Sequence, residues 1–241
     1  MKALRVEDHS LAVREVEKPT PDGEAIVRVT LSGICNTDLE IARGYAGFQG
    51  TLGHEFVGVV ESGEHAGQRV VGEINAGCGH CDLCRAGDSR HCAARSVLGI
   101  VGRDGAHAEF LTLPQRNLFV VPDEVTDEHA VFTEPLAAAC GILERTAINE
   151  DTKVAVIGDG KLGLLCAQVV ALTGARVLCV GKHPEKLRIA SRRSIETAAV
   201  AEAAKRKREF DVVVEASGSA SGQWISPTPL TWKLPQSRIF L

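Results

Sequence analysis

Four of the eight cysteines fall within fifteen consecutive residues, and this cluster restricts the fold more tightly than any other feature of the sequence. The four are Cys78, Cys81, Cys84 and Cys92. A structural Zn²⁺ prefers four thiolate or imidazole ligands in a tetrahedron, and closely spaced cysteines on a glycine-rich loop can surround one ion. Such a loop needs no hydrophobic core, because metal binding supplies its folding free energy. The cluster therefore predicts a structural zinc lobe over residues 77–93.

Two other interpretations compete with a structural zinc lobe: four unrelated reduced cysteines, or a zinc finger that binds nucleic acid. The 27 basic and 31 acidic residues leave a formal net charge of -4, and no basic recognition helix accompanies the cysteines. We therefore expect neither nucleic acid nor a membrane surface as a partner. His80 and His91 lie inside the cluster and could replace a cysteine, but four sulfurs already fill the shell.

The sequence shows no secretory signal and no membrane-spanning stretch. Lys2, Arg5, Glu7 and Asp8 interrupt the N-terminal residues, and no apolar run reaches the length of about 18 residues that a span requires. We therefore expect a cytoplasmic protein with reduced cysteines. Three isolated cysteines stand in apolar surroundings and are expected to be small buried side chains. They are Cys140, Cys166 and Cys179.

The chain of 241 residues is long enough for two domains, and its pattern changes near Asn149. Before that point, short apolar runs alternate with glycine and proline. This pattern predicts a compact β-rich domain over residues 1–148, with a helical stretch from about residue 123. The β-type runs are residues 25–29, 56–60 and 109–113.

Beyond Asn149, buried strands and helices alternate, which predicts a parallel, doubly wound sheet over residues 149–222. Residues 195–200 fit either a short strand or a helix. The fold class is therefore α/β with a preceding β-rich domain. Strands are expected at residues 154–157, 176–180 and 210–215, and helices at residues 162–172 and 184–193.

The last residues, 223–241, follow neither a helical nor a strand period. They contain both tryptophans, Trp224 and Trp232. A dinucleotide-binding sheet should continue here, so the sequence predicts an incomplete sheet with a divergent tail, as in a truncated or alternatively spliced product. The basic run at residues 205–208 follows an alanine-rich stretch and is expected to be a solvated helix end.

A glycine-rich loop, Gly158-Asp-Gly-Lys-Leu-Gly163, lies between the first strand and the first helix of the second domain. Glycines there permit a tight turn, a close approach of the backbone to a pyrophosphate, and close packing of helix against strand. The pattern alone is weak, but its place between a buried strand and a helix favours NAD(P) binding over a ligand-free turn. The expected contacts are Gly158, Gly160, Lys161, Leu162 and Gly163.

The end of the second strand bears on the choice of cofactor. In NAD-binding sheets an acidic residue there accepts a hydrogen bond from the ribose 2′-hydroxyl. Here Gly181 stands at that place, Lys182 and His183 follow, and Glu185 belongs to the next helix. The sequence therefore predicts a preference for NADP over NAD, with Lys182 facing the 2′-phosphate.

Three further segments carry metal-ligand chemistry. They are Gly33-Ile-Cys35-Asn-Thr-Asp38, Gly53-His54-Glu55 and Thr133-Glu134-Pro135. Each is weak by itself, because a single Cys35 or His54 is more often a buried side chain than a ligand. Glu134, before a proline, is also consistent with helix entry alone.

Taken in order, these segments resemble the medium-chain dehydrogenase/reductase family, in particular its zinc-binding branch of alcohol, polyol and threonine dehydrogenases. The resembling motifs extend from about residue 4 to residue 218 and include the cysteine lobe, Glu134-Pro-Leu136 and the glycine loop. The resemblance implies a GroES-like catalytic domain followed by a Rossmann domain, here incomplete.

The resemblance also implies a catalytic zinc held by Cys35 and His54, with Glu55 or Glu134 completing the shell. The residues do not decide between the two carboxylates. A glutamate rather than a cysteine at position 134 resembles the polyol branch. Zinc with three protein ligands keeps one position for a substrate oxygen and lowers the pKa of a bound hydroxyl.

By the same resemblance, the hydroxyl of Thr37 releases the substrate proton, and Asp38 orients His54 in the second shell. One position departs from the family pattern. Where several members have a relay histidine, this chain has Glu40, which leaves the later steps of proton release open.

The predicted function is a zinc-dependent oxidoreductase that transfers hydride between a secondary alcohol or polyol and NAD(P). The alternative is a truncated zinc-binding remnant without activity, which the composition of the tail suggests. A zinc-free quinone reductase of the same superfamily is disfavoured, because both sets of metal ligands are present. Dimers or tetramers are usual in the resembling family, so homo-oligomers are expected.

Overall fold

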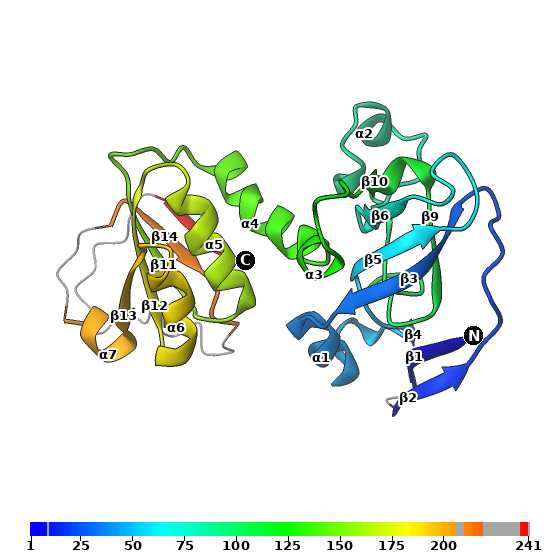
Figure 1. Ribbon diagram of the computed structural model, residues 1–241, viewed down its shortest axis with the longest axis horizontal. Coiled ribbons are helices and arrows are strands. Elements are labelled where there is room, and N and C mark those ends of the chain that lie inside the picture. Colours follow the sequence, from blue (N-terminus) through cyan, green and yellow to red (C-terminus); the bar gives the residue numbers. More distant parts are fainter. Residues whose placement is uncertain (9, 206–209, 219–236, 241) are drawn as a thin grey trace. The chain divides into compact units, whose positions relative to one another are not determined.

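Two units, Met1–Glu134 and Pro135–Leu241, each carry their own hydrophobic core in the computed structural model (Figure 1). The structure describes residues 1–8, 10–205, 210–218 and 237–240. The boundary between the units falls inside helix α4 (Thr133–Arg145), whereas the sequence pattern placed it near Asn149. The difference arises because Ala139 and Ile142 of this helix, both fully buried, pack in the core of the second unit.

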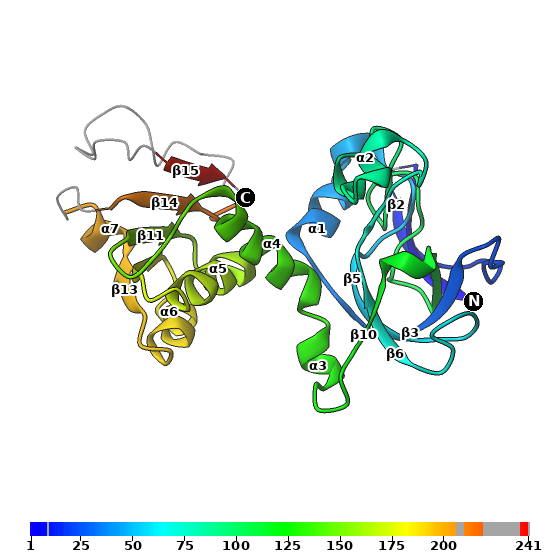
Figure 2. The ribbon, with the colours of Figure 1, turned by 90° about the horizontal axis from the view of Figure 1, so that it is seen from above.

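The first unit is built from antiparallel strands (Figures 1 and 2). Its main sheet has the order β10-β6-β5-β3-β9, and a smaller sheet has the order β2-β1-β4. The bounds of the main sheet are β3 (Ala25–Gly33), β5 (Glu55–Val60), β6 (Arg69–Gly72), β9 (Phe110–Leu113) and β10 (Leu118–Val120). The other strands are β1 (Lys2–Glu7), β2 (Ser10–Glu15), β4 (Gly50–Thr51) and the pair β7 (Asn75–Ala76) and β8 (Ser96–Val97). The β-rich first domain predicted from the glycine-broken apolar runs is confirmed.

Short helices fill the connections of the first unit. The α-helices are α1 (Asn36–Ala42), α2 (Asp82–Arg85) and α3 (Asp127–Ala130), and the 3₁₀ helices are η1 (Tyr45–Gly47), η2 (Ser89–His91) and η3 (Gln115–Asn117). Two of them matter for function. Helix α1 follows β3 directly, and α2 lies inside the cysteine lobe.

The second unit is a parallel sheet of five strands in the order β13-β12-β11-β14-β15, with a helix after each of the first three strands in chain order (Figure 1). The strands are β11 (Lys153–Ile157), β12 (Arg176–Gly181), β13 (Glu196–Ala199), β14 (Val212–Glu215) and β15 (Ser237–Phe240). The helices are α5 (Lys161–Ala171), α6 (Pro184–Ser191) and α7 (Val200–Ala203). Parallel strands covered by helices read as continuous apolar runs, which is why β11 and β12 were recognisable in the sequence.

Two local expectations needed revision. Residues 195–200 form both alternatives in succession, strand β13 and then the start of helix α7. The tail was expected to hold no regular strand, but β15 pairs with β14 in parallel, Ser237 opposite Val212. Four residues are too few to show a period, so only pairing with a neighbouring strand defines this element. Both tryptophans and the basic residues 206–208 lie outside the described residues.

One cysteine expectation was wrong. Cys166 and Cys179 are completely buried, as predicted, but Cys140 is exposed. In helix α4 the buried positions are Pro135, Ala139 and Ile142, and Cys140 follows directly after one of them. One residue turns a helix by about 100°, so a neighbour of a buried position faces away from it.

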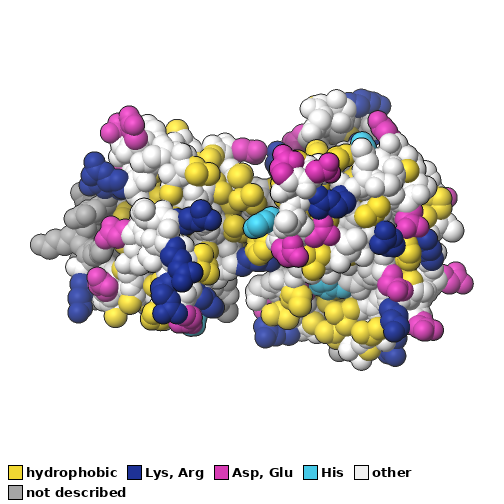
Figure 3. Space-filling view, in the orientation of Figure 1, with side chains coloured by type: hydrophobic (Ala, Val, Ile, Leu, Met, Phe, Trp, Pro, Cys, Tyr) yellow, Lys and Arg dark blue, Asp and Glu magenta, His cyan; other side chains and the backbone are white. Residues whose placement is uncertain are grey.

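Among the described residues, no helix has both the length and the apolar character needed to cross a lipid bilayer. On the face drawn in Figure 3, basic and acidic side chains are interspersed over the first unit, in keeping with the small net charge of -4.

The packing of α4 leads to a stability prediction. Replacing the fully buried Ile142 with alanine should lower the free energy of unfolding of the second unit by about 2–4 kcal/mol, because it leaves a cavity. Hydrogen exchange should then accelerate in β11 and α5 but not in β3 and β5. The control is Leu143→Ala on the same helix, where the side chain is 39% exposed and the cost should stay below about 1 kcal/mol. Faster exchange in both units would contradict the assignment of α4.

Candidate metal centres and cofactor loop

Cys35, His54 and Glu55 converge in the first unit, with one potential ligand atom of each within 4.8 Å of the others. Strand pairing explains the convergence. Glu55 begins β5 and pairs with Gly33, the last residue of the neighbouring antiparallel strand β3. Cys35 follows two residues later as the N-cap of α1. Residues 20 positions apart in the chain are thus placed side by side by the register of two strands.

Two glycines make room for this arrangement. A Cβ atom at Gly33 would collide with the Glu55 side chain. Gly53 has a φ of +98°, which disfavours other residues, and its Cβ would lie 2.6 Å from the backbone nitrogen of His107. The glycines that flank the candidate ligands in the sequence are therefore required by the packing of the site.

The buried carboxylate of Asp38 joins the two ligand segments. Its Oδ2 accepts a hydrogen bond of 2.8 Å from the backbone nitrogen of Cys35, and its Oδ1 accepts one of 3.2 Å from that of Gly53. His54 Nδ1 lies 3.4 Å from Oδ1, and His107 Nε2 lies 3.6 Å from Oδ2. Burial alone would raise the pKa of Asp38, but these donors outweigh it and hold the pKa well below its usual range. The carboxylate is therefore ionised and holds both loops.

His54 is 3% exposed, and its Nδ1 makes no well-aligned hydrogen bond within the described part of the chain. Because this Nδ1 faces Asp38 Oδ1 at 3.4 Å, the ring nitrogen that a metal ion would use is Nε2. Burial lowers the pKa of His54, but Asp38 and Cys35 together raise it to about 10. For Cys35, burial raises the pKa, and His54 and Thr37 more than offset this. The site thus stabilises a thiolate with a positive charge beside it, a charge that a divalent cation can supply.

The two carboxylates proposed for the metal are not equivalent. Glu55 belongs to the group whose ligand atoms lie within 4.8 Å of one another, and Glu134 does not. Glu134, at the start of α4, acts on His54 through its charge and helps to raise the pKa of that imidazole. The placement of the side chains therefore favours Glu55 as the closer partner of Cys35 and His54.

Thr37 lies in the first turn of α1, with its Oγ1 3.7 Å from the Cys35 sulfur. Its half-buried hydroxyl is next to the candidate ligand set. Glu40, one turn further along the helix, forms an ion pair of 2.7 Å with Arg43 at the surface. Glu40 is thus held by a surface cation rather than by the ligand cluster.

No pattern in the sequence points to His107 as part of the site. Its Nδ1 lies 2.9 Å from Ser32 Oγ, and its Nε2 lies 3.6 Å from the Oδ2 of Asp38 that also accepts from the backbone of Cys35. The ring is almost fully buried, with 9% of the side chain exposed. A lone histidine between two alanines, far from the other motifs, carries no local pattern, so only the tertiary structure identifies it as the support of Asp38.

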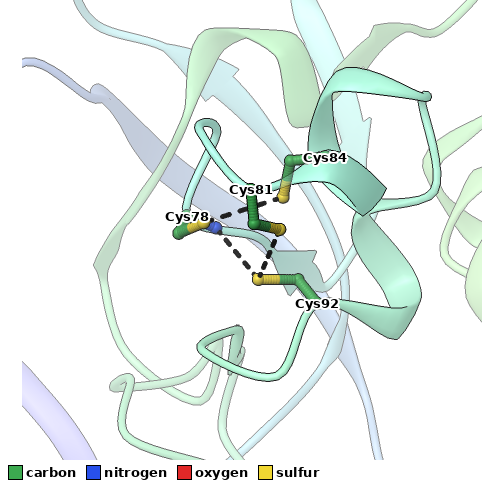
Figure 4. A group of neighbouring side chains, drawn as sticks. All are labelled: Cys78, Cys81, Cys84 and Cys92. Atoms are coloured by element: carbon green, nitrogen blue, oxygen red, sulfur yellow. Dashed lines mark hydrogen bonds between the residues drawn. The ribbon is translucent and has the colours of Figure 1, made fainter.

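The four cysteines of the lobe converge, and Figure 4 shows their sulfur atoms facing a common centre. Cys78 and Cys84 have a sulfur separation of 4.0 Å, and Cys81 and Cys92 one of 3.8 Å. A disulfide would need about 2.05 Å. Four sulfurs at about 2.3 Å from one zinc ion in a tetrahedron lie about 3.8 Å apart. The observed separations therefore fit a tetrahedral zinc site, and the interpretation as unrelated cysteines fails.

The electrostatics of the lobe also fit a cation. Backbone N–H groups of His80 and Cys81 lower the pKa of Cys78 to about 6. The pKa of Cys84 rises to about 11, because burial and the neighbouring sulfurs outweigh the hydrogen bond from Gly79. Four thiols so close together cannot all ionise without a positive charge among them.

Neither histidine of the lobe joins the four sulfurs. The exposed His80 has its Nδ1 2.9 Å from the carbonyl oxygen of Cys78, and the exposed His91 pairs with Asp88 at 2.7 Å. The lobe is anchored to the rest of the unit by Arg116, which donates a hydrogen bond of 2.7 Å to the carbonyl of Gly77.

In the second unit, the glycine loop connects β11 to α5 with the geometry that each glycine was predicted to provide. Gly158 has a φ of +129°, and a Cβ there would collide with the carbonyl of Ala216. A Cβ at Gly163 would collide with the carbonyl of Gly158, so helix and strand are in close contact. A Cβ at Gly160 would meet nothing within 4 Å, which leaves this backbone open to a ligand. These observations fit a pyrophosphate-binding turn.

The N-terminus of α5 lacks a side-chain cap. Its N-cap is Gly160, and Lys161 and Leu162 form the first turn. Uncapped amides at a helix N-terminus carry partial positive charge and can bind an anion. Lys182 lies just beyond β12 and is exposed, and its backbone nitrogen donates a hydrogen bond of 2.7 Å to Asp159 Oδ2. No pattern in the sequence indicates this contact between the turns after β11 and β12.

Comparison with known proteins agrees with this architecture. The family described as "Alcohol dehydrogenase GroES-like domain" matches residues 21–123. An L-threonine 3-dehydrogenase of Mesorhizobium japonicum is 34% identical over 249 residues, which cover 91% of this chain and 71% of that protein. A sorbitol dehydrogenase of Halalkalibacterium halodurans is 36% identical over 202 residues, covering 78% of this chain and 59% of its own length.

Solved structures show the same fold. An alcohol dehydrogenase from Escherichia coli CFT073 in complex with NADH has a TM-score of 0.82 and 29% identity, covering 91% of this chain and 70% of that chain. A cobalt- and zinc-bound alcohol dehydrogenase from Pyrobaculum aerophilum has a TM-score of 0.80 and 28% identity, covering 92% and 72%. A Sinorhizobium meliloti protein bound to NADP has a TM-score of 0.81 and 28% identity, covering 99% and 83%.

The chain therefore belongs to the medium-chain dehydrogenase/reductase family, in its branch of zinc-dependent alcohol, polyol and threonine dehydrogenases. It spans about half to two thirds of the length of the first curated relatives it matches.

The lobe provides a prediction about metal content. Cys84→Ala should remove one equivalent of bound zinc per chain and make residues 77–93 sensitive to protease, because the lobe then loses the ion that replaces a core. Atomic absorption and limited proteolysis measure both effects. Cys140→Ser is the matched control, since this exposed thiol belongs to no metal cluster among the described residues. Unchanged zinc content in Cys84→Ala would contradict the assignment of the lobe.

Proposed function

We propose that this chain carries the catalytic and cofactor-binding machinery of a zinc-dependent oxidoreductase that transfers a hydride between a secondary alcohol or polyol and NAD(P). The observation that carries the proposal is the convergence of Cys35, His54 and Glu55 beside the hydroxyl of Thr37. The open backbone at Gly160 supports the cofactor part. Relatives that act on sorbitol and threonine support the substrate class, a small molecule with a secondary hydroxyl.

The donor set fits a catalytic zinc. A thiolate, an imidazole and a carboxylate are its usual protein ligands, and one such atom each of Cys35, His54 and Glu55 lies within 4.8 Å of the others. Cys35, His54 and one carboxylate would hold the ion. Glu55 is the stronger candidate for that carboxylate by its placement, with Glu134 as the alternative. When bound, zinc supplies a Lewis acid that makes a substrate hydroxyl easier to deprotonate.

The surrounding residues position the ligands and move the proton. Asp38 holds the loops of Cys35 and Gly53 together and keeps the His54 ring in one orientation. The hydroxyl of Thr37 accepts the proton that leaves the substrate and passes it on toward solvent. Glu40, which pairs with Arg43 at the surface, stands where several family members have a relay histidine, so the proton passes from Thr37 to solvent without that relay.

The second unit would bind the nicotinamide cofactor through its glycine loop, whose residues Gly158, Gly160 and Gly163 shape the turn. The backbone of Lys161 and Leu162 offers amides to the pyrophosphate at the start of α5. When bound, the nicotinamide supplies the hydride acceptor. The four-cysteine lobe would hold a second, structural zinc.

A second candidate is a zinc-binding protein without dehydrogenase activity. Its support is the four-cysteine lobe, whose sulfur separations fit a structural zinc without any catalytic role. The two candidates differ in what the purified chain binds. Two zinc ions together with a nicotinamide dinucleotide support the oxidoreductase, whereas one zinc ion and no dinucleotide support the second candidate. An assay with secondary alcohols and polyols then tests turnover directly.

The choice of carboxylate ligand can be tested by two matched variants. Glu55→Gln should lower the affinity of the catalytic zinc ion by roughly 100-fold or more, because it removes an anionic ligand. Glu134→Gln removes the same charge from a side chain outside the ligand group, so its affinity should fall by about tenfold at most. Competition with a chromophoric chelator measures both affinities. The reverse order of effects would assign the ligand to Glu134.

The role of Thr37 predicts a defect in proton transfer alone. Thr37→Val should lower kcat by roughly 100-fold, while zinc content and dinucleotide affinity stay unchanged, because only the hydroxyl is removed. Thr37→Ser restores a hydroxyl and should recover most of the activity. Equal activity in the valine and serine variants would show that the proton takes another path.

A further inference from the structure

The end of β12 lacks the acidic side chain that reads the ribose in NAD-binding sheets. Gly181 stands there, and Lys182 and His183 follow. From the sequence alone, this pattern predicted a preference for NADP. The structure, however, brings a carboxylate to the same place from the loop that follows β11.

That carboxylate belongs to Asp159, the second residue of the glycine loop. Its Oδ2 accepts hydrogen bonds from the backbone nitrogens of Lys182 (2.7 Å) and His183 (2.6 Å). The ring Nδ1 of His183 lies 3.0 Å from Oδ2 and 3.2 Å from Oδ1. Only 10% of the Asp159 side chain is exposed. The side chain is therefore fixed across the gap between the turns that follow β11 and β12.

The glycine at the end of β12 is matched to this aspartate. A Cβ atom at Gly181 would collide with the Cβ and carboxylate of Asp159. The space that an acidic side chain at position 181 would enter is therefore taken by an acid from position 159. The acid that the usual pattern places at position 181 is absent, and the acid at position 159 lies at the same point in space.

We propose that Asp159 determines cofactor selectivity and makes the chain prefer NAD over NADP. This inference rests on the proposed function, namely that the glycine loop binds a nicotinamide dinucleotide. Oδ2 of Asp159 accepts two backbone hydrogen bonds, whereas Oδ1 has only the contact of 3.2 Å with the ring of His183 among the described residues. Oδ1 therefore keeps a lone pair that can accept a hydrogen bond from the ribose 2′-hydroxyl. A 2′-phosphate at the same place would meet a buried negative charge and be repelled.

The ionised state of Asp159 is supported by its surroundings. Burial would raise its pKa, but the backbone and ring donors of His183 and the backbone of Lys182 outweigh burial and lower it. A carboxylate held by these donors stays charged at neutral pH.

Lys182 is the competing determinant, since its ammonium could attract a 2′-phosphate. The two side chains differ in how firmly they are held. Asp159 is buried and held by backbone donors, so its charge is already in place before a ligand arrives. Lys182 is exposed, and fixing its long side chain on a phosphate costs conformational entropy. Related structures carry NADH in one case and NADP in another, so the fold alone does not decide between the two cofactors.

The test is a comparison of dissociation constants for NAD and NADP, measured by isothermal titration calorimetry on the zinc-loaded chain. Wild type should bind NAD at least about tenfold more tightly than NADP. Asp159→Asn should reduce this preference by roughly tenfold or more, chiefly by tightening NADP, because it removes the charge and keeps the shape.

Two variants serve as controls. Glu185→Gln removes one negative charge from an exposed position in the first turn of α6, and its preference should change by less than about threefold, because solvent screens it. Lys182→Ala should likewise leave the ratio of the two dissociation constants within about threefold. A selective loss of NADP binding in Lys182→Ala would overturn the proposal in favour of the lysine.

A further variant guards against a merely structural role of Asp159. If this residue only joined the two turns, Asp159→Asn would weaken both dinucleotides equally and leave their ratio unchanged, which would overturn the proposal. The double variant Asp159→Ser, Gly181→Asp places the acid on β12 instead and should recover the preference for NAD.

The wild-type chain alone also tests the idea if the variants do not fold. Binding of NADP as tightly as NAD would overturn this inference and leave the proposed function standing. Binding of neither dinucleotide would overturn both.

Discussion

The carboxylate of Asp38 is the contact on which the candidate catalytic site depends. It is 3% exposed and accepts hydrogen bonds from the backbone nitrogens of Cys35 and Gly53, which belong to two different connections of the β-rich unit. The register of β3 and β5 brings those connections together, and the carboxylate then fixes their distance. Because His54 faces the same carboxylate, Asp38 sets both the backbone positions of Cys35 and Gly53 and the orientation of the His54 ring. Asp38 thus joins the segments that carry Cys35 and His54, and the imidazole of His107 lies 3.6 Å from its Oδ2.

Both cysteine-containing clusters share one electrostatic requirement. In the first, Asp38, Cys35 and Glu134 together raise the pKa of the buried imidazole of His54 to about 10. In the second, neighbouring thiols push the pKa values of Cys78 and Cys84 apart, to about 6 and about 11. A divalent ion replaces several protons at once, so metal binding relieves the repulsion that proximity creates.

The sequence was informative where function depends on local spacing. The cysteine lobe, the glycine loop and the strands β11 and β12 follow from patterns within fifteen to thirty residues. It was uninformative where distant segments meet. Cys140 was expected to be buried and is exposed, β15 was not expected at all, and His107 carried no signal. In each case the outcome depends on which face or which neighbour the tertiary structure supplies, and no periodicity within one segment encodes that choice.

The turn after β12 shows the same limit at the level of chemistry. A motif assigns the ribose-reading acid to one position in the chain, and its absence at Gly181 would indicate a positively charged pocket. Electrostatic selectivity, however, depends on where a charge lies in space and not on which strand carries it. A parallel sheet places the turns after β11 and β12 next to each other, so a side chain from one can occupy the site of the other. Asp159 and Gly181 depend on each other. An acid at position 181 would collide with Asp159, and without Asp159 a glycine at position 181 would leave this place without an acid. A cofactor preference is therefore better inferred from this pair than from the last residue of β12 alone.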